Sequence, residues 1–301
     1  MSLLVTGSIG IDTVETPHAR VDQVLGGSSV YFALAAALFS EVRMVGVVGE
    51  DFDLTLFDPL RARGIDLGGV EVRRGSKTFR WHGKYHADLN ERDTVSVELN
   101  VLAERGATIP PEFADSRFVF LANTHPALQH ECALRFPKAE LIVCDTMNLW
   151  IENEPDELRR TLATVHGLVL NDGEARLFTG EANLVSAGRR ILKMGPRFVV
   201  IKKGEHGSLL VSRDDLFLLP AYPTTKVVDP TGCGDSFAGA MMGYLAAQGR
   251  HDGQVLRAAM ARGSVVASYV VESFSIEALA QATIEHVDRR LAELLEMTRF
   301  E

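Results

Sequence analysis

The segment from Lys226 to Gly249 (KVVDPTGCGDSFAGAMMGYLAAQG) combines residue types that could transfer a phosphoryl group. Residues 227–229 are expected to end a strand, and the apolar residues that follow Asp235 recur at helical spacing. Gly232 and Gly234 lack Cβ atoms, so the backbone N–H groups of the turn between these elements can approach a ligand closely. The turn lies at the positive end of the helix macrodipole. The segment therefore predicts a binding site for phosphate oxygens.

Asp235 stands beside this predicted anion site, where a carboxylate repels the ligand unless the chemistry uses it. As a general base, Asp235 would take a proton from a substrate hydroxyl that attacks a phosphoryl group. The backbone amides of Gly232, Cys233 and Gly234 would then neutralise the charge that grows on that group. The alternative is that Asp235 only caps the helix, because Asp is a preferred N-cap residue.

Short runs of β-branched and aliphatic residues alternate along the chain with segments of helical spacing. The runs begin at Leu3, Val42, Phe118, Leu141, Gly167 and Phe198. This alternation predicts an α/β fold in which a mostly parallel sheet is covered by helices on both faces. Ligands of such sheets bind beyond the carboxyl ends of the strands, so polar residues that follow the runs, such as Asp145 and Asn171, are candidate site positions.

Two stretches break the alternation and predict a small β-sheet outside the main one. Residues 12–27 and 70–99 alternate aromatic and β-branched residues with polar ones, and glycines punctuate the turns. An inserted sheet of this kind covers a ligand as a lid or forms a dimer contact, and the sequence leaves both open. Candidate substrate contacts in the second stretch, which could equally be solvent-exposed groups, are Arg80, Trp81, Lys84, Tyr85 and His86.

The composition excludes several classes of protein. The chain has 301 residues and a net charge of −9, from 31 basic and 40 acidic residues, which gives no electrostatic reason to bind nucleic acid or an anionic membrane. The longest apolar run, Val30 to Phe39, is too short to span a bilayer, and the N-terminus lacks the layout of a signal peptide. The three cysteines form no disulfide or metal-finger pattern. We therefore expect a cytoplasmic protein.

The segment DPTGCGDSFAGA resembles the C-terminal signature of the PfkB, or ribokinase-like, carbohydrate and nucleoside kinases. Four further segments resemble elements of this family in the same order: GSIGID, GGSSVYFALAAA, NDGEARLFTG and IKKGEHG. The resemblance covers nearly the whole chain. It implies a single three-layer α/β/α domain over residues 1–301 with a β-sheet lid, and ATP-dependent phosphorylation of an alcohol.

The resemblance also implies an acceptor site. It places Asp12 on the hydroxyls of the acceptor, with Gly26, Gly27, Tyr31 and Asn148 beside it. Tyr31 stands where the family usually has asparagine, and the alternative is a buried aromatic residue of an apolar helix. Asp12 and Asn148 are alternatively turn residues, whose side chains bond the local backbone.

The nucleotide side of the site is likewise implied by the resemblance. Asn171, Lys202, Gly204 and Gly207 are expected to bind ATP together with Gly232 and Gly234, and Glu174 to hold Mg²⁺ through water. Asn171 and Glu174 also have the spacing of a capping box, and both roles are compatible. In some relatives a monovalent cation such as K⁺ binds at the positions of Asp229 and Thr231.

The expected function is an ATP- and Mg²⁺-dependent kinase that phosphorylates a hydroxyl of a small sugar or sugar-like substrate. Two alternatives stay open, namely a nucleoside kinase that accepts an adenosine-like substrate and a catalytically inactive member that only binds ligand. The chain lacks the GxGxxG and GxxxxGK[ST] motifs, so phosphate binding depends on the Gly232 turn. A homodimer through the lid is implied by the resemblance alone.

Overall fold

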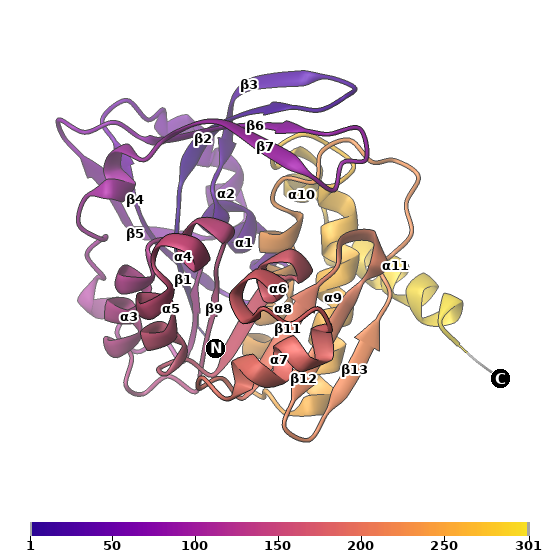
Figure 1. The fold of residues 1–301 in the computed structure, drawn as a ribbon. Helices are drawn as coiled ribbons and strands as arrows, with labels where there is room; N and C mark the ends of the chain where they lie inside the picture. The colour runs from indigo at the N-terminus through magenta and orange to yellow at the C-terminus, as the bar shows by residue number, and fades with distance from the viewer. Residues whose placement is uncertain (1, 300–301) are drawn as a thin grey trace.

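A computed structural model describes residues 2–299 and contains a large sheet and a small one (Figure 1). The strands of the large sheet are β1 (Leu3–Thr6), β4 (Val42–Gly49), β5 (Asp66–Arg73), β8 (Phe118–Leu121), β9 (Leu141–Asp145), β10 (Gly167–Asn171), β11 (Phe198–Lys202), β12 (Ser208–Ser212) and β13 (Leu216–Leu219). Their order across the sheet is β13-β12-β11-β10-β9-β8-β1-β4-β5. The pairs β11–β12 and β12–β13 are antiparallel, and all other neighbouring strands of this sheet are parallel. The six runs expected to be strands are all strands, and the prediction of a mostly parallel sheet is confirmed.

Helices cover both faces of the large sheet and give the predicted three layers. One face carries α1 (Ser28–Ala36), α2 (Asp58–Ala62), α8 (Cys233–Gln248), α9 (Gly253–Val270), α10 (Glu277–Gln281) and α11 (Ile284–Met297). The other carries α3 (Pro126–Leu134), α4 (Asn148–Asn153), α5 (Pro155–Leu162), α6 (Asp172–Thr179) and α7 (Leu184–Leu192). A separate cluster of buried apolar side chains fills each interface. Among residues 2–299, no helix has the length and apolar character that crossing a bilayer requires.

Two glycines of α8 bring this helix into backbone contact with α1. A Cβ atom at Gly239 would lie 2.3 Å from the carbonyl oxygen of Phe32, and one at Gly243 would lie 2.5 Å from that of Ala36. No side chain fits in either space, so the two helices pack closely. Because the contacts advance together along both chains, the helices run parallel and their N-termini lie at the same end of the sheet. The Gly26–Gly27 loop and the Gly232 turn are thereby placed side by side.

The small sheet consists of β2 (Gly10–Glu15), β3 (Arg20–Gly26), β6 (Phe79–Tyr85) and β7 (Arg92–Glu98), in the order β3-β2-β6-β7. It lies across the top of the molecule in Figure 1, and we call it the lid. The predicted small sheet is therefore present. Its second segment begins later than residue 70, because residues 70–73 belong to β5 and pair with β4. The edge strand β7 exposes Val95 and Val97, and a dimer through the lid stays a prediction.

The expected strand at residues 227–229 is absent, so this prediction is wrong. The backbone N–H groups of Val228 and Asp229 both donate to the carbonyl oxygen of Val271, at 2.8 and 3.2 Å. The segment is thus held as an irregular loop by the end of α9 instead of by a neighbouring strand. Helix α8 begins at Cys233, two residues earlier than its apolar spacing predicts.

Candidate active site

The turn before α8 presents two free amides at the N-terminus of a 16-residue helix. Gly232 has φ +78°, a conformation that strains any residue with a Cβ atom, and such an atom would lie 2.3 Å from Cδ1 of Tyr31. Within residues 2–299, the backbone N–H groups of Gly232 and Gly234 have no hydrogen-bond acceptor. The Cys233 amide donates to the Pro230 carbonyl oxygen at 3.2 Å. Of the three predicted anion-hole amides, two are therefore available without a rearrangement.

Asp235 lies in the first turn of α8, beside these amides. Burial raises the pKa of its carboxyl to about 6, with a smaller contribution from Glu174, while Lys202 and Arg92 act in the opposite direction. The Lys202 ammonium is close, since its Nζ atom lies 2.7 Å from where a Cβ atom of Gly234 would be. A carboxylate with a pKa near 6 is ionised at neutral pH and retains enough basicity to accept a proton from an alcohol.

Asp12 lies on the inner side of the lid strand β2 and has the character of a ligand-binding carboxylate. It is only 4% exposed, and its Oδ1 atom has no hydrogen-bond partner within the described residues. Burial raises its pKa to about 7, helped by the charges of Asp229 and Asp235. A buried unpaired oxygen of this kind is costly unless a ligand satisfies it.

Two glycines make room for the Asp12 carboxylate. A Cβ atom at Gly26 would lie 1.9 Å from Oδ2 of Asp12, so no side chain fits there. Gly27 has φ +103°, and a Cβ atom at this position would lie 2.5 Å from the carbonyl oxygen of Ser8. The carboxylate of Asp12 therefore lies next to the N-terminus of α1. The two glycines are needed there because any side chain would occupy the space of the buried acid or of the neighbouring backbone.

The structure favours a buried, supporting role for Tyr31. The residue is 2% exposed, its ring packs against Gly232, and burial raises the pKa of its hydroxyl well above the ordinary value. Asn148 is the exposed first residue of α4, and its side chain forms no hydrogen bond within the described part of the chain. Tyr31 is thus a buried residue, and Asn148 is an exposed residue whose side chain no hydrogen bond fixes. Neither is both accessible to a ligand and fixed beside Asp12 and Asp235.

The ends of β9 and β10 bring further carboxyl groups to the same edge of the large sheet. Asp145 ends β9, is 5% exposed, and has an Oδ1 atom without a partner in residues 2–299. Burial and the charge of Asp235 raise its pKa well above the ordinary value. Glu174 and Asn171 form the predicted capping box of α6, with reciprocal bonds of 2.7 Å to each other's backbone N–H groups. Burial raises the pKa of Glu174 as well.

These carboxylates fit a magnesium ion that reaches the protein through its water shell. The part of the chain that the structure describes contains no group of three or more His, Cys, Asp or Glu side chains that could bind a metal directly. The free Oδ1 atom of Asp145 and the buried Glu174 supply two carboxylates near Lys202 and Asp235. Mg²⁺ usually keeps several waters and is held through one or two carboxylates, which matches this donor set.

Asp229 and Thr231 precede the turn as predicted for a monovalent-cation site. Asp229 is fully buried; its Oδ1 atom accepts the Thr231 N–H at 2.8 Å, and its Oδ2 atom has no partner within residues 2–299. The Thr231 hydroxyl donates to the Tyr85 hydroxyl at 3.0 Å. Asp229 is thus poised beside the turn, and a cation there stays a prediction.

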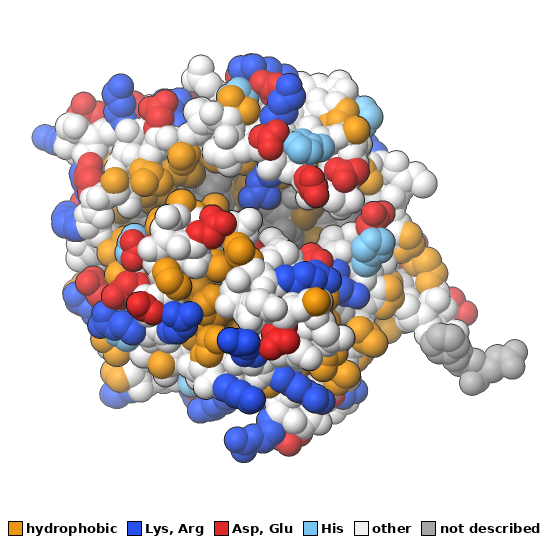
Figure 2. Space-filling view, in the orientation of Figure 1, with side chains coloured by type: hydrophobic (Ala, Val, Ile, Leu, Met, Phe, Trp, Pro, Cys, Tyr) orange, Lys and Arg blue, Asp and Glu red, His pale blue; other side chains and the backbone are white. Residues whose placement is uncertain are grey.

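The lid closes over this edge of the sheet. Besides the Tyr85–Thr231 bond, the lid turn reaches the loop after β11, where a Cβ atom of Gly204 would lie 3.5 Å from Oδ1 of Asn90. Figure 2 shows the hollowed surface between the lid and the helices below it. Gly207, in the same loop as Gly204, has φ +83°, and a Cβ atom would lie 2.0 Å from the Leu219 carbonyl oxygen. This glycine is therefore required by the fold of the loop itself.

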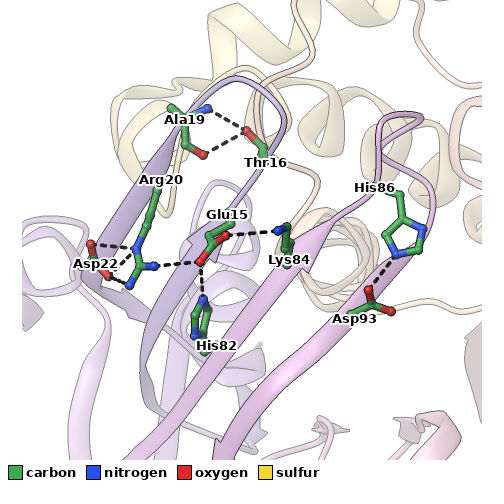
Figure 3. A network of polar contacts seen from close by, with 9 residues as sticks. All are labelled: Glu15, Thr16, Ala19, Arg20, Asp22, His82, Lys84, His86 and Asp93. Atoms are coloured by element: carbon green, nitrogen blue, oxygen red, sulfur yellow. Dashed lines mark hydrogen bonds and ion pairs between the residues drawn. The ribbon is translucent and has the colours of Figure 1, made fainter.

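The two faces of the lid differ in chemistry. On its outer face, Glu15 contacts Arg20, His82 and Lys84, while His86 bonds Asp93 (Figure 3). The inner face carries Asp12 and Trp81, which are paired directly across β2 and β6, and Tyr85 further along β6. Trp81 and Tyr85 are among the candidate contacts predicted from the sequence, whereas Arg92 is not, because its position opposite Tyr85 depends on strand register. The alternation of side chains along residues 92–98 is the signal that could have placed Arg92 on the inner face. The register shift next to Gly83 obscures this signal, because it breaks the simple pairing of β6 with β7.

Replacing Cys233 with alanine is expected to leave turnover within about twofold of the native value. Burial raises the pKa of the Cys233 thiol, which stays protonated, and within residues 2–299 the only hydrogen bond of its Sγ atom is to the Ala267 carbonyl oxygen, at 3.6 Å. Alanine fills a similar small apolar site. Steady-state kinetics and alkylation by iodoacetamide test this, and a large drop in turnover would give the thiol a role in catalysis.

Comparison with known proteins gives one family. A model of that family, described as pfkB family carbohydrate kinase, matches residues 3–282. A cytidine kinase from Thermococcus kodakarensis is 31% identical over 257 residues, which are 83% of this chain and 89% of that protein. A nucleoside kinase from Methanothermobacter thermautotrophicus is 26% identical over 283 residues, 92% of this chain and 88% of that protein.

Solved structures share the fold. An aminoimidazole riboside kinase from Salmonella enterica, crystallised with aminoimidazole riboside and an ATP analogue, superposes with a TM-score of 0.78 at 18% identity. The superposition covers 97% of this chain and all (100%) of that chain. At this identity the similarity is one of fold.

Proposed function

Because the chain belongs to the pfkB family of carbohydrate kinases, and is therefore a phosphotransferase with an alcohol group as acceptor, we propose that it transfers the γ-phosphoryl group of ATP to a hydroxyl of a nucleoside. The proposal rests on the cluster that surrounds the Gly232 turn. A buried base, two free amides and a second buried carboxylate for the acceptor lie at one edge of the sheet, under the lid.

In this mechanism Asp235 takes the proton of the acceptor hydroxyl as the hydroxyl oxygen bonds to the γ-phosphorus of ATP. The bond from that phosphorus to the bridging oxygen breaks, and ADP leaves with the electron pair. The free amides of Gly232 and Gly234 donate to the oxygens of the migrating group, where negative charge develops. Since these donors are fixed by the turn, they need no reorganisation during the reaction.

Asp12 holds the acceptor, and Lys202 supports the nucleotide. The unpaired Oδ1 atom of Asp12 accepts a hydrogen bond from a ribose hydroxyl, which restores the partner that the buried oxygen lacks. Lys202, at the end of β11, places a positive charge against Gly234, next to the expected position of the phosphates. Asp145 and Glu174 hold Mg²⁺ through water, and the ion when bound neutralises charge on the phosphates.

The inner face of the lid favours a nucleoside over a free sugar. Trp81 is paired directly with Asp12, so an aromatic ring stands beside the carboxylate that would bind the ribose. Its indole lies across Gly83, where a Cβ atom would be 1.9 Å from Cη2, and its Nε1 donates to Thr94 at 3.3 Å. This fixed ring offers a stacking surface for a base. The two curated relatives named above, a cytidine kinase and a nucleoside kinase, support the same acceptor class.

A panel of acceptors tests the proposal directly. Nucleosides, free sugars, sugar phosphates and inositols are assayed with MgATP for ADP release and for the phosphorylated product. We expect at least one nucleoside to give a kcat/KM that exceeds that of every free sugar by tenfold or more. Higher activity on a free sugar would contradict the nucleoside proposal, and the absence of transfer to any hydroxyl would contradict the kinase mechanism.

Replacing Asp12 with asparagine is expected to raise the KM for the acceptor at least tenfold and to raise the melting temperature at pH 8. In the folded protein burial raises the pKa of Asp12 from its ordinary value of 3.8 to about 7, so between these two pH values the unfolded chain releases its proton first and the folded state loses stability. Above about pH 7 the full cost remains. The neutral amide removes this cost. The stability difference should shrink as the pH falls from about 7 to about 4 and be absent below that, where the carboxyl is protonated in both states.

Thermal unfolding at pH 4 and pH 8 gives the stability readout for Asp12→Asn, and Asp22→Asn on the exposed part of β3 is the control. A lower melting temperature of Asp12→Asn at pH 8 would show that the carboxylate is paired instead of free.

A further inference from the structure

Arg92 lies on the inner face of the lid, whereas the next residue, Asp93, lies on the outer face. Arg92 is the first residue of β7 and pairs directly with Tyr85 of β6 in the antiparallel register. Directly opposed residues of an antiparallel pair project to the same face of a sheet. The Tyr85 hydroxyl contacts the Thr231 hydroxyl at 3.0 Å, so this face looks onto the turn before α8. Arg92 therefore projects toward the Gly232 turn.

The guanidinium of Arg92 has no acid to neutralise it. Among the described residues it forms no ion pair, and its partner is the Trp81 ring, whose centroid lies 5.6 Å away. Other cationic groups of this hairpin do have acidic partners: Arg80 contacts Asp51 at 3.0 Å, and His86 contacts Asp93 at 2.9 Å. An unpaired cation held over an aromatic ring remains available for an anionic ligand.

The charge of Arg92 reaches the catalytic carboxylates. Both Asp235 and Glu174 have their pKa lowered by Arg92, against the larger effect of burial. The other cation that acts on both carboxylates is Lys202, which approaches from the strand ends of the large sheet. Arg92, from the lid, and Lys202, from the main sheet, thus act on the same two carboxylates, and Lys202 lies against Gly234 of the turn.

We propose that Arg92 is a catalytic residue of the lid, which donates hydrogen bonds to the oxygens of the migrating phosphoryl group and so completes the anion hole from above. This inference deepens the proposed kinase function and rests on it. A planar guanidinium carries several N–H donors in a fixed fork and suits phosphate oxygens. The guanidinium of Arg92 transfers no proton. It stabilises the migrating phosphoryl group most at the point of the reaction where that group carries the most negative charge. The Tyr85–Thr231 bond fixes the lid in the position that this contact needs.

Replacing Arg92 with alanine tests the proposal. We expect kcat to fall about 10²-fold, which is the usual effect of removing one donor from an anion hole, while the KM of the acceptor changes less than threefold. Arg92→Lys is expected to recover part of the loss, and added guanidinium ion to raise the rate of Arg92→Ala in a saturable way. The pH at which the acid limb of kcat/KM is half-maximal should move upward, because Asp235 loses a nearby positive charge.

Arg80→Ala is the matched control, because Arg80 is a paired arginine on the neighbouring strand β6 and on the opposite face of the lid from Arg92. We expect it to keep kcat within threefold of the native value. A native kcat in Arg92→Ala, or equal losses in Arg92→Ala and Arg80→Ala, would overturn the proposal. These outcomes require an active parent enzyme. The absence of any kinase activity in the parent would instead contradict the proposed function.

Discussion

Replacing Asp235 with asparagine is expected to lower kcat at least about 10²-fold while leaving nucleotide binding nearly unchanged. The amide has nearly the same shape as the carboxylate but cannot accept the proton of the acceptor hydroxyl. The repulsion between the carboxylate and the phosphates also disappears, so the affinity for ATP should stay equal or increase. Single-turnover transfer from γ-labelled ATP measures the chemical step, and calorimetric titration with a non-hydrolysable ATP analogue measures binding.

The matched control for Asp235→Asn is Asp214→Asn, which changes an exposed acid between β12 and β13. It should leave both quantities unchanged. If Asp235→Asn kept more than a tenth of the native rate of transfer, a different base would have to act. Asp145 would then be the first candidate, since it is buried and its titration is linked to that of Asp235 by their charges.

Replacing Gly232 with alanine should have a comparably large effect, through the backbone. At φ +78° a residue with a Cβ atom costs about 1–2 kcal/mol, and here that atom would also lie 2.3 Å from the Tyr31 ring. The fully buried ring cannot move aside easily, so the turn must shift. We expect this shift to displace the free amides and lower kcat about 10²-fold, together with a lower melting temperature.

Gly249→Ala separates the catalytic effect from the loss of stability. Gly249 ends the same helix α8 in the same left-handed conformation, with φ +60°, but lies at the opposite end from the cluster. It should lower the melting temperature through the same backbone strain and leave kcat unchanged. Equal losses of kcat in the two variants would show that the turn before α8 matters only for stability.

The local elements could be predicted from the sequence more completely than the contacts between residues far apart in the chain. Periodicity predicted six of the nine strands of the large sheet, and the spacing of Asn171 and Glu174 predicted a capping box, because both signals lie within a few neighbouring residues. The strand expected at residues 227–229 failed, because two backbone N–H groups donate to Val271, which lies more than forty positions away. A local pattern carries no information about such a partner.

The sequence indicated glycines and acids that the structure brings together, but it did not indicate a residue whose position depends on strand register. Gly26 and Asp12 were both named from the sequence, and the structure packs them together; their role in binding the acceptor stays a prediction. Arg92 was not found, since its inward position depends on the pairing of β6 with β7 and on the register shift beside Gly83. The burial of Tyr31 under Gly232 also follows from the packing of α1 on α8, which helical spacing alone does not specify.

The pH dependence of kcat/KM for ATP, measured with the acceptor saturating, tests the central claim most directly. Under these conditions Asp12 is already bound to the acceptor, and the acid limb reports the base. We predict that kcat/KM falls as the pH drops through about 6, because Asp235 then takes up a proton, and that this limb is lost in Asp235→Asn. A limb that persists unchanged in Asp235→Asn would contradict the assignment of this carboxylate as the group that deprotonates the alcohol.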